Sequence, residues 1–192
     1  MVRNTAREIA IHLSYELSFT DKPIDALLNE RLTADSFAAL AAEDSVYQEV
    51  PNTKQEAYIR RLVKGVDEHA AELDGYIAKY AKGWSFARIP LVASAIMRVA
   101  MYEILYMPEI PNGAAINEAV EIAKKYETPE TVKFINGILG SFTRQEAGEW
   151  ADWQSGAGEY PRPALLFYPP GPAPGDEEVL HGAAYFQCDG SE

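Results

Sequence analysis

The sequence is poor in cysteine, histidine and long apolar runs, and each shortage excludes a class of protein. Its 192 residues include one cysteine, Cys188, so an internal disulfide is impossible. With three histidines and no Cys/His spacing of the metal-binding type, no metal site is expected. The longest mostly apolar run, residues 89–107, contains Arg98 and Glu103, which argues against a membrane-spanning helix. The first residues lack the apolar core of a signal peptide, so a cytoplasmic protein with no membrane partner is expected.

Recognisable catalytic patterns are also missing. His12, His69 and His181 are scattered along the chain, and there is no Ser-His-Asp arrangement, P-loop or HExxH motif. A glycine-rich loop for a methyl donor is absent as well. We therefore expect no catalytic residue, no cofactor and no enzymatic activity.

Positive charge is scarce at the C-terminal end. The whole chain carries 17 Lys and Arg against 29 Asp and Glu, for a net charge of −12. Residues 146–192 hold nine of these acids and a single base, Arg162, together with six of the 12 prolines and seven of the 13 glycines. This composition predicts an irregular acidic extension, flexible or loosely docked.

Residues 1–145, in contrast, have the apolar spacing of helices and no strand-like alternation. The pattern is clear near the N-terminus, where apolar residues recur at intervals of three and four: Ala6, Ile9, Ala10, Leu13 and Leu17. The chain is therefore expected to be all-α, with one helical domain over residues 1–145 and the extension over 146–192.

Prolines and one threonine predict where helices begin. Pro23 opens the second helix, and Pro90 is placed in the first turn of a helix that runs to about Met107, because an interior proline would cost about 3 kcal/mol. Thr128 suits the N-cap of the last helix and Pro129 suits its first position.

Two glycines lie three apart inside that last helix. Gly137 and Gly140 each cost up to roughly 1 kcal/mol relative to alanine. Glycines at such positions usually let a neighbouring backbone or side chain approach closely, so we expect a close helix contact there.

Four segments together resemble the NusB family of transcription antitermination factors. The segments are RNTAREIAIHLSYEL (residues 3–17), RVAMYE (98–103) preceded by Arg88, INEAVEIAK (116–124) and KFINGIL (133–139). The resemblance covers about residues 2–145, and the C-terminal combination is its specific part. Residues 146–192 lie outside it.

The resemblance implies a fold of two packed helical bundles and a role in rRNA transcription and maturation. Proteins of this family pair with NusE, a ribosomal protein of the small subunit. The pair binds the boxA sequence in nascent RNA and joins an antitermination complex on RNA polymerase. The expected partners are therefore boxA-like single-stranded RNA, NusE and that complex.

Five residues are candidates for RNA binding: Arg3, Arg7, Tyr15, Lys133 and Phe134. The two arginines, one helical turn apart, would contact phosphates, and Tyr15 would stack on a base. Lys133 and Phe134 place a cation beside an aromatic ring. The alternatives are a solvated face for the arginines and a core position for Phe134. The family's opening helix usually carries more basic residues, so weak binding with a shallow salt dependence is expected.

Aromatic residues gather around Gly83, where a helix is expected to end. The resemblance places the NusE contact near this corner, and aromatic side chains are favoured interface anchors. Some of the rings must also belong to the core. The candidates for partner binding are Tyr76, Tyr80, Trp84 and Phe86.

A structural polar network is expected from five further residues: Arg98, Glu103, Asn117, Glu118 and Asn136. Arg98 lies among apolar neighbours and needs a partner, for which Glu118 or Glu103 is the natural choice. The asparagines would satisfy backbone groups or bond between helices, or else contact a ligand directly.

Two questions stay open at this level. The chain is either an RNA-binding antitermination factor or a helical protein-interaction module with a weakened RNA surface. The acidic extension either competes weakly with RNA for the basic residues or only solubilises the protein.

Overall fold

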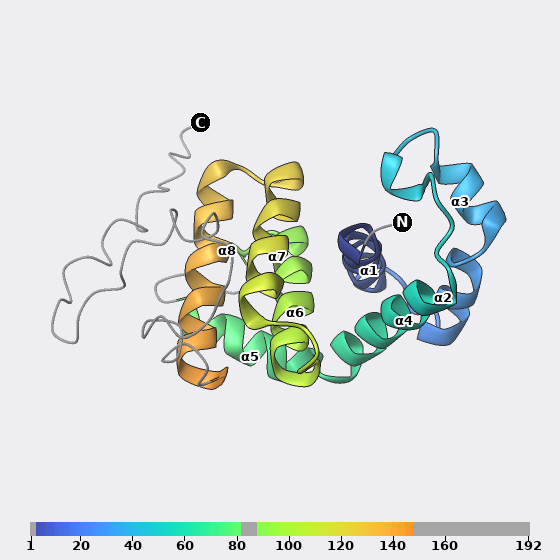
Figure 1. Ribbon diagram of the computed structural model, residues 1–192. Coiled ribbons are helices and arrows are strands. Elements are labelled where there is room, and N and C mark those ends of the chain that lie inside the picture. The colour runs from blue at the N-terminus through green and yellow to red at the C-terminus, as the bar shows by residue number, and fades with distance from the viewer. Residues whose placement is uncertain (1–2, 82–87, 148–192) are drawn as a thin grey trace, which may run out of the picture. The chain divides into compact units, whose positions relative to one another are not determined.

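Helices make up all the regular secondary structure in the parts of the computed structural model that are described, residues 3–81 and 88–147 (Figure 1). They are α1 (Arg3–Leu17), α2 (Ile24–Arg31), α3 (Ala34–Leu40), the 3-10 turn η1 (Ser45–Tyr47), α4 (Thr53–Glu68), α5 (Ala70–Tyr80), α6 (Leu91–Tyr106), α7 (Asn112–Tyr126), α8 (Pro129–Phe142) and the π-helical turn η3 (Thr143–Ala147). The all-α prediction is confirmed. Within these ranges, no helix is long and apolar enough to cross a membrane. Most of the predicted acidic extension, residues 148–192, lies outside the described residues.

The predicted helix starts agree with the structure to within one residue. The Thr128 hydroxyl accepts a hydrogen bond from the Thr131 N–H at 3.3 Å, and Pro129 is the first residue of α8. Pro23 and Pro90 each stand immediately before a helix, so Pro90 lies one position earlier than the predicted first turn. Proline is tolerated there because those N–H groups have no partner inside the helix.

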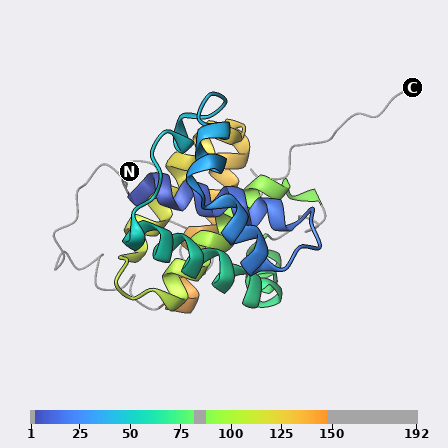
Figure 2. The same ribbon diagram turned by 90° about the vertical axis from the view of Figure 1, so that its right-hand side faces the viewer.

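Helix α6 is the central element of two packed groups of helices. It contacts α1 and α4 of the first group and α5, α7 and α8 of the second (Figure 1). Figure 2, in which the first group faces the viewer, shows α1 lying beside α4. Eleven of the residues of α6 are buried, as expected for a helix that is apolar on most sides. The two-bundle architecture agrees with the prediction.

A close approach occurs at a glycine that was not predicted. Of the two predicted glycines, Gly137 is exposed and a Cβ atom added to it would meet nothing within 4 Å, so the prediction is wrong there. Gly140 is buried, and a close contact at that position stays a prediction. Gly65 in α4 is buried, and a Cβ atom at that position would overlap the ring of Tyr102 in α6. The absent side chain therefore lets α4 and α6 pack around the tyrosine.

Candidate functional site

Arg7 is buried inside the helical bundle. Arg7 is 2% exposed. Its Nε donates to Glu103 Oε2 at 2.8 Å, and its Nη2 donates to Glu103 Oε1 at 3.0 Å. The Tyr58 hydroxyl donates to the same carboxylate. Burial alone would lower the pKa of the Arg7 guanidinium, but the bonds to Glu103 outweigh it and the pKa is raised. Arg7 thus joins α1, α4 and α6.

The prediction that Arg3 and Arg7 lie on one RNA-facing surface is therefore wrong. Arg3 is exposed at the start of α1, whereas Arg7, one turn further, meets α6. A spacing of four places both on one side of α1, but the partner helix covers only the second position. The buried Glu103 requires a cation, and Arg7 provides it.

The other RNA-binding candidates keep some exposure. Tyr15 is half-buried, and its ring meets that of Phe19 edge to face at a centroid distance of 4.9 Å. Lys133 is exposed on α8. Phe134 is half-buried and packs against the core, so a core role and a surface role are both compatible with its position. Whether these residues bind RNA stays a prediction.

The partner-binding candidates that can be described pack on Phe142. The rings of Tyr76 and Tyr80 lie 5.1 Å and 6.2 Å from the Phe142 ring. The Tyr80 hydroxyl donates to Glu146 Oε1 at 2.5 Å, and burial followed by this bond raises the pKa of Tyr80. Both tyrosines are half-buried. Trp84 and Phe86 lie outside the described residues, so this surface stays a prediction.

Arg98 does not pair with the predicted carboxylates. Its Nε donates to Asp74 Oδ1 at 2.6 Å and its Nη2 to Oδ2 at 2.8 Å, which ties α6 to α5. Glu103 lies five positions along α6, about 140° further around the helix, so it points toward α1 instead. The predicted pairing of Arg98 with Glu118 or Glu103 is thus wrong.

The other members of the predicted network lie at the edge of the bundle interior. Glu118 is half-buried. Burial lowers the pKa of Arg7 and Glu103 raises it, and the charge of Glu118 adds a smaller increase. Asn117 and Asn136 are half-buried as well. Only Glu103 of the predicted set lies fully inside the bundle, with an exposure of 0%.

Sequence reasoning missed a second polar network, which joins α1 to the end of α7. The buried Glu8 carboxylate accepts from Lys125 Nζ at 2.6 Å and from the Tyr126 hydroxyl at 2.7 Å. His12 lies between two hydroxyls, with Nε2 2.8 Å from Tyr126 and Nδ1 2.8 Å from Tyr47. The available signal was a carboxylate at position 8, immediately before the apolar residues Ile9, Ala10 and Ile11.

Burial sets the protonation of this second network. It lowers the pKa of His12, against the opposing charges of Asp44 and Glu8, and therefore favours the neutral imidazole. Burial, followed by the charge of Asp44, also raises the pKa of Tyr47 to about 12. Burial, followed by the bond to Glu8, raises the pKa of Tyr126 as well, so His12 and its two tyrosine partners are neutral at physiological pH.

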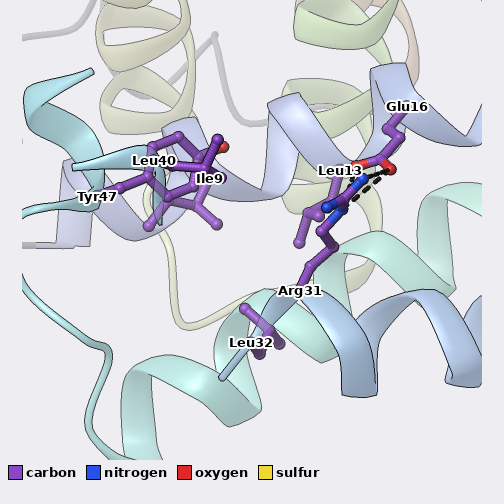
Figure 3. A pocket seen from close by; sticks show the side chains of 7 residues that line it. All are labelled: Ile9, Leu13, Glu16, Arg31, Leu32, Leu40 and Tyr47. Atoms are coloured by element: carbon purple, nitrogen blue, oxygen red, sulfur yellow. Dashed lines mark hydrogen bonds and ion pairs between the residues drawn. The ribbon is translucent and has the colours of Figure 1, made fainter. Parts of the chain in front are cut away.

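A cavity beside this network is too small for a typical ligand. It has a volume of about 200 Å³ and lies between α1, α2, α3 and η1, with the Arg31–Glu16 ion pair at its polar side (Figure 3). Arg31 Nη2 lies 2.6 Å from Glu16 Oε1. Small-molecule pockets usually measure about 300–1,000 Å³. In the described part of the chain, no cluster of side chains is arranged to hold a metal ion.

Comparison with known proteins assigns this arrangement to a family. Residues 4–144 match the sequence pattern described as the NusB family. The chain belongs to the NusB family. The transcription antitermination protein NusB of Symbiobacterium thermophilum is 36% identical over 148 residues, which cover 77% of this chain and 93% of that protein. The protein is therefore a transcription antitermination factor and not an enzyme.

Solved structures of the family have the same fold. NusB of T. maritima aligns with a TM-score of 0.63 and 28% identity, covering 80% of this chain and 98% of the other. A crystal structure of the antitermination factors NusB and NusE in complex with dsRNA aligns with a TM-score of 0.58 and 22% identity, covering 74% and 96%. The NusB resemblance read from the sequence is thus confirmed, and so is the fold that it implied.

Proposed function

We propose that this antitermination factor binds boxA-like single-stranded RNA of rRNA operons together with the ribosomal protein NusE. Through them it joins the antitermination complex on RNA polymerase, in the cytoplasm. The observation that carries the proposal is the family match over residues 4–144, which includes every candidate residue of both surfaces except Arg3. The solved complex of NusB and NusE contains dsRNA, and it supports testing NusE and RNA as the two partner classes.

The exposed cations define the phosphate contacts of this proposal. Arg3 on α1 and Lys133 on α8 are exposed, and Lys133 stands beside the half-buried Phe134. Because Arg7 is occupied by Glu103, the opening helix contributes fewer phosphate contacts than its sequence suggested. Affinity for RNA alone is therefore expected to be low and to rise when NusE is present.

A gel-shift titration with boxA-like RNA, with and without NusE, tests the proposal. Arg3→Gln and Lys133→Gln should each weaken RNA binding and reduce the salt slope by about 0.7, the value for one lost contact to a single strand. Lys64→Gln is the matched control, because Lys64 lies on α4 and pairs with Asp25 at 2.5 Å. An unchanged salt slope in both test variants would remove these cations from the RNA site.

The NusE contact is tested separately at the tyrosine corner. Tyr80→Ala should lower NusE affinity by on the order of 2 kcal/mol, as for an aromatic interface anchor. A variant that melts early but still binds NusE would assign Tyr80 to the core, through its packing on Phe142.

A second candidate function is favoured by the burial of Arg7. With this base inside the bundle, the chain fits a protein-binding module whose RNA surface is weakened. That function predicts tight NusE binding with no gain in affinity when boxA-like RNA is added.

A further inference from the structure

One face of α1 carries a row of residues that the proposed function has not used. Glu8, His12, Tyr15 and Phe19 follow one another at intervals of four, three and four positions. At 3.6 residues per turn the first three, which lie within α1, fall within about 60° around the helix axis, along about 10 Å of its length. Phe19 lies in the turn after Leu17, where its N–H donates to the Glu16 carbonyl at 3.0 Å. Arg7 points away from this row, because adjacent positions differ by about 100°.

Tyr126 of α7 joins the same face through its hydroxyl. That group donates to Glu8 Oε1 at 2.7 Å, and His12 Nε2 lies 2.8 Å from it. Since the hydroxyl proton is given to Glu8, the oxygen accepts from Nε2–H, and the neutral imidazole then accepts from the Tyr47 hydroxyl at Nδ1. The polar tip of Tyr126 is fixed at two points, while the residue as a whole is 40% exposed.

The exposed apolar side chains also single out this face. Among the described residues, the large apolar side chains left exposed are Phe19 at 62%, Val50 at 51%, Leu91 at 48% and Tyr126 at 40%. Both aromatic members of this group adjoin the α1 face, Phe19 in the turn after α1 and Tyr126 at the end of α7. Between them lie the half-buried rings of His12 and Tyr15, which contact Tyr126 and Phe19 respectively at centroid distances of 5.4 Å and 4.9 Å.

Exposed rings that are held in place suit unpaired nucleobases. Every base offers a flat face to an aromatic side chain, and stacking contributes about 1–3 kcal/mol per base. A ring that is already fixed loses little rotational freedom on binding. Lys125, whose side chain is 53% exposed, pairs with Glu8 at 2.6 Å, so the rings and not a cation are the contact groups of this face. A protein interface would instead be expected to bury a contiguous core depleted in charge.

We propose that the aromatic stripe, defined as His12, Tyr15, Phe19 and Tyr126, stacks the bases of single-stranded RNA. Phe19 and Tyr126 are its two main contact rings, and Glu8 is a positioning residue that holds Tyr126. The proposal rests on the proposed function for its ligand and names the side chains that meet the bases. It adds Phe19, His12 and Tyr126 to the predicted site.

The test is a binding titration with boxA-like RNA that carries 2-aminopurine, a base whose fluorescence falls on stacking. Tyr126→Leu and Phe19→Leu should each weaken binding about 5- to 150-fold, the equivalent of one lost base stack. The salt slope should not change, because no phosphate contact is removed. Leu91→Ala is the control, since Leu91 is exposed but outside the stripe.

The positioning role has its own variant. Tyr126→Phe keeps the ring and removes the hydroxyl that bonds to Glu8 and His12. It should retain the fluorescence quenching and bind RNA more weakly than the wild type but more tightly than Tyr126→Leu. Equal binding by the Phe and Leu variants would show that the ring does not stack. Because Phe19 is mostly exposed, Phe19→Leu keeps the test valid even if Tyr126→Leu fails to fold.

The outcomes separate this proposal from the function on which it rests. If the wild type binds RNA and both Leu variants bind it with the same affinity, the stacking proposal is wrong and the proposed function stands. Loss of NusE binding with RNA binding intact would make the stripe a protein contact and overturn it too. If the wild-type chain binds no RNA with or without NusE, the proposed function and the stripe both fall.

Discussion

The two sides of helix α1 differ in both chemistry and exposure. One side places Arg7 against Glu103 and Tyr58, in a buried polar cluster that joins three helices. The other carries the aromatic stripe, whose end residues Phe19 and Tyr126 are exposed. The charged side chain is thus interior and the apolar rings are at the surface, the reverse of the usual distribution. The type of a side chain therefore does not decide whether it stabilises the fold or remains available to a ligand.

The largest effect is expected from breaking the buried side. Arg7→Met leaves the Glu103 carboxylate buried without its cation, so the free energy of unfolding should fall by about 3–5 kcal/mol. Arg3→Met is the matched control, because Arg3 is exposed and its loss should change stability by less than about 0.5 kcal/mol. Urea unfolding of both variants gives the two values.

A second variant shows whether charge or packing is responsible. Replacing the cluster as a whole, with Arg7→Met, Glu103→Leu and Tyr58→Phe, removes the unpaired carboxylate and should recover most of the lost stability. Equal destabilisation by Arg7→Met and Arg3→Met would mean that the buried pair does not hold the helices together.

The next effect concerns the close contact between α4 and α6. Gly65→Ala places a methyl group where the Tyr102 ring lies, and overpacking of this kind typically costs about 1–3 kcal/mol. Gly75→Ala in α5 is the control, since a Cβ atom there meets nothing within 4 Å and alanine favours the helix by up to about 1 kcal/mol. Thermal melts should move in opposite directions, and a shift in the same direction would contradict the packing seen at Gly65.

A smaller effect is expected at the half-buried pair of Arg98 and Asp74. Their side chains are 16% and 29% exposed, against 3% and 0% for Arg7 and Glu103, so solvent screens the interaction more strongly. Asp74→Asn should reduce the free energy of unfolding by about 1 kcal/mol. A double-mutant cycle with Arg98→Met isolates the pair, and a coupling as large as that of Arg7 with Glu103 would contradict this ranking.

The helices were predictable because their signals are local. Apolar spacing, the prolines before α2 and α6 and the Thr128 cap all act within a few residues. The family resemblance then supplied the two-bundle arrangement. Glu103 could also have been excluded as the partner of Arg98 from their angular separation on α6 alone.

The partners of the site residues were not predictable in the same way. Arg7 meets Glu103 across 96 positions, and Glu8 meets Tyr126 across 118. Which side of α1 is covered depends on how α4 and α6 cross it, and periodicity describes a helix without its neighbours. The stripe escaped notice because its fourth ring comes from a distant helix, while His12 alone looked like an isolated histidine.

The smallest expected effect is a pH dependence that belongs to the stripe side of α1. Burial lowers the pKa of His12, an effect that the charges of Asp44 and Glu8 oppose and that of Lys125 reinforces. The unfolded chain binds a proton near its ordinary pKa of about 6.5, whereas the folded state resists it. The contribution of His12 to the free energy of unfolding is thus fully present above about pH 6.5. It is lost as the pH falls toward the lower, folded-state pKa of His12.

His12→Gln removes this titration while keeping a side chain that can donate and accept hydrogen bonds. Urea unfolding at about pH 7.5 and about pH 5.5 should show a larger loss of stability for the wild type than for the variant. Comparing the two proteins cancels the contribution of the carboxylates, which titrate in both. Parallel losses would mean that His12 accepts a proton in the folded state as readily as in the unfolded one. The bond at Nδ1 would then not require the neutral ring, because a protonated Nδ1 would donate to the Tyr47 oxygen, while Nε2–H would still donate to Tyr126.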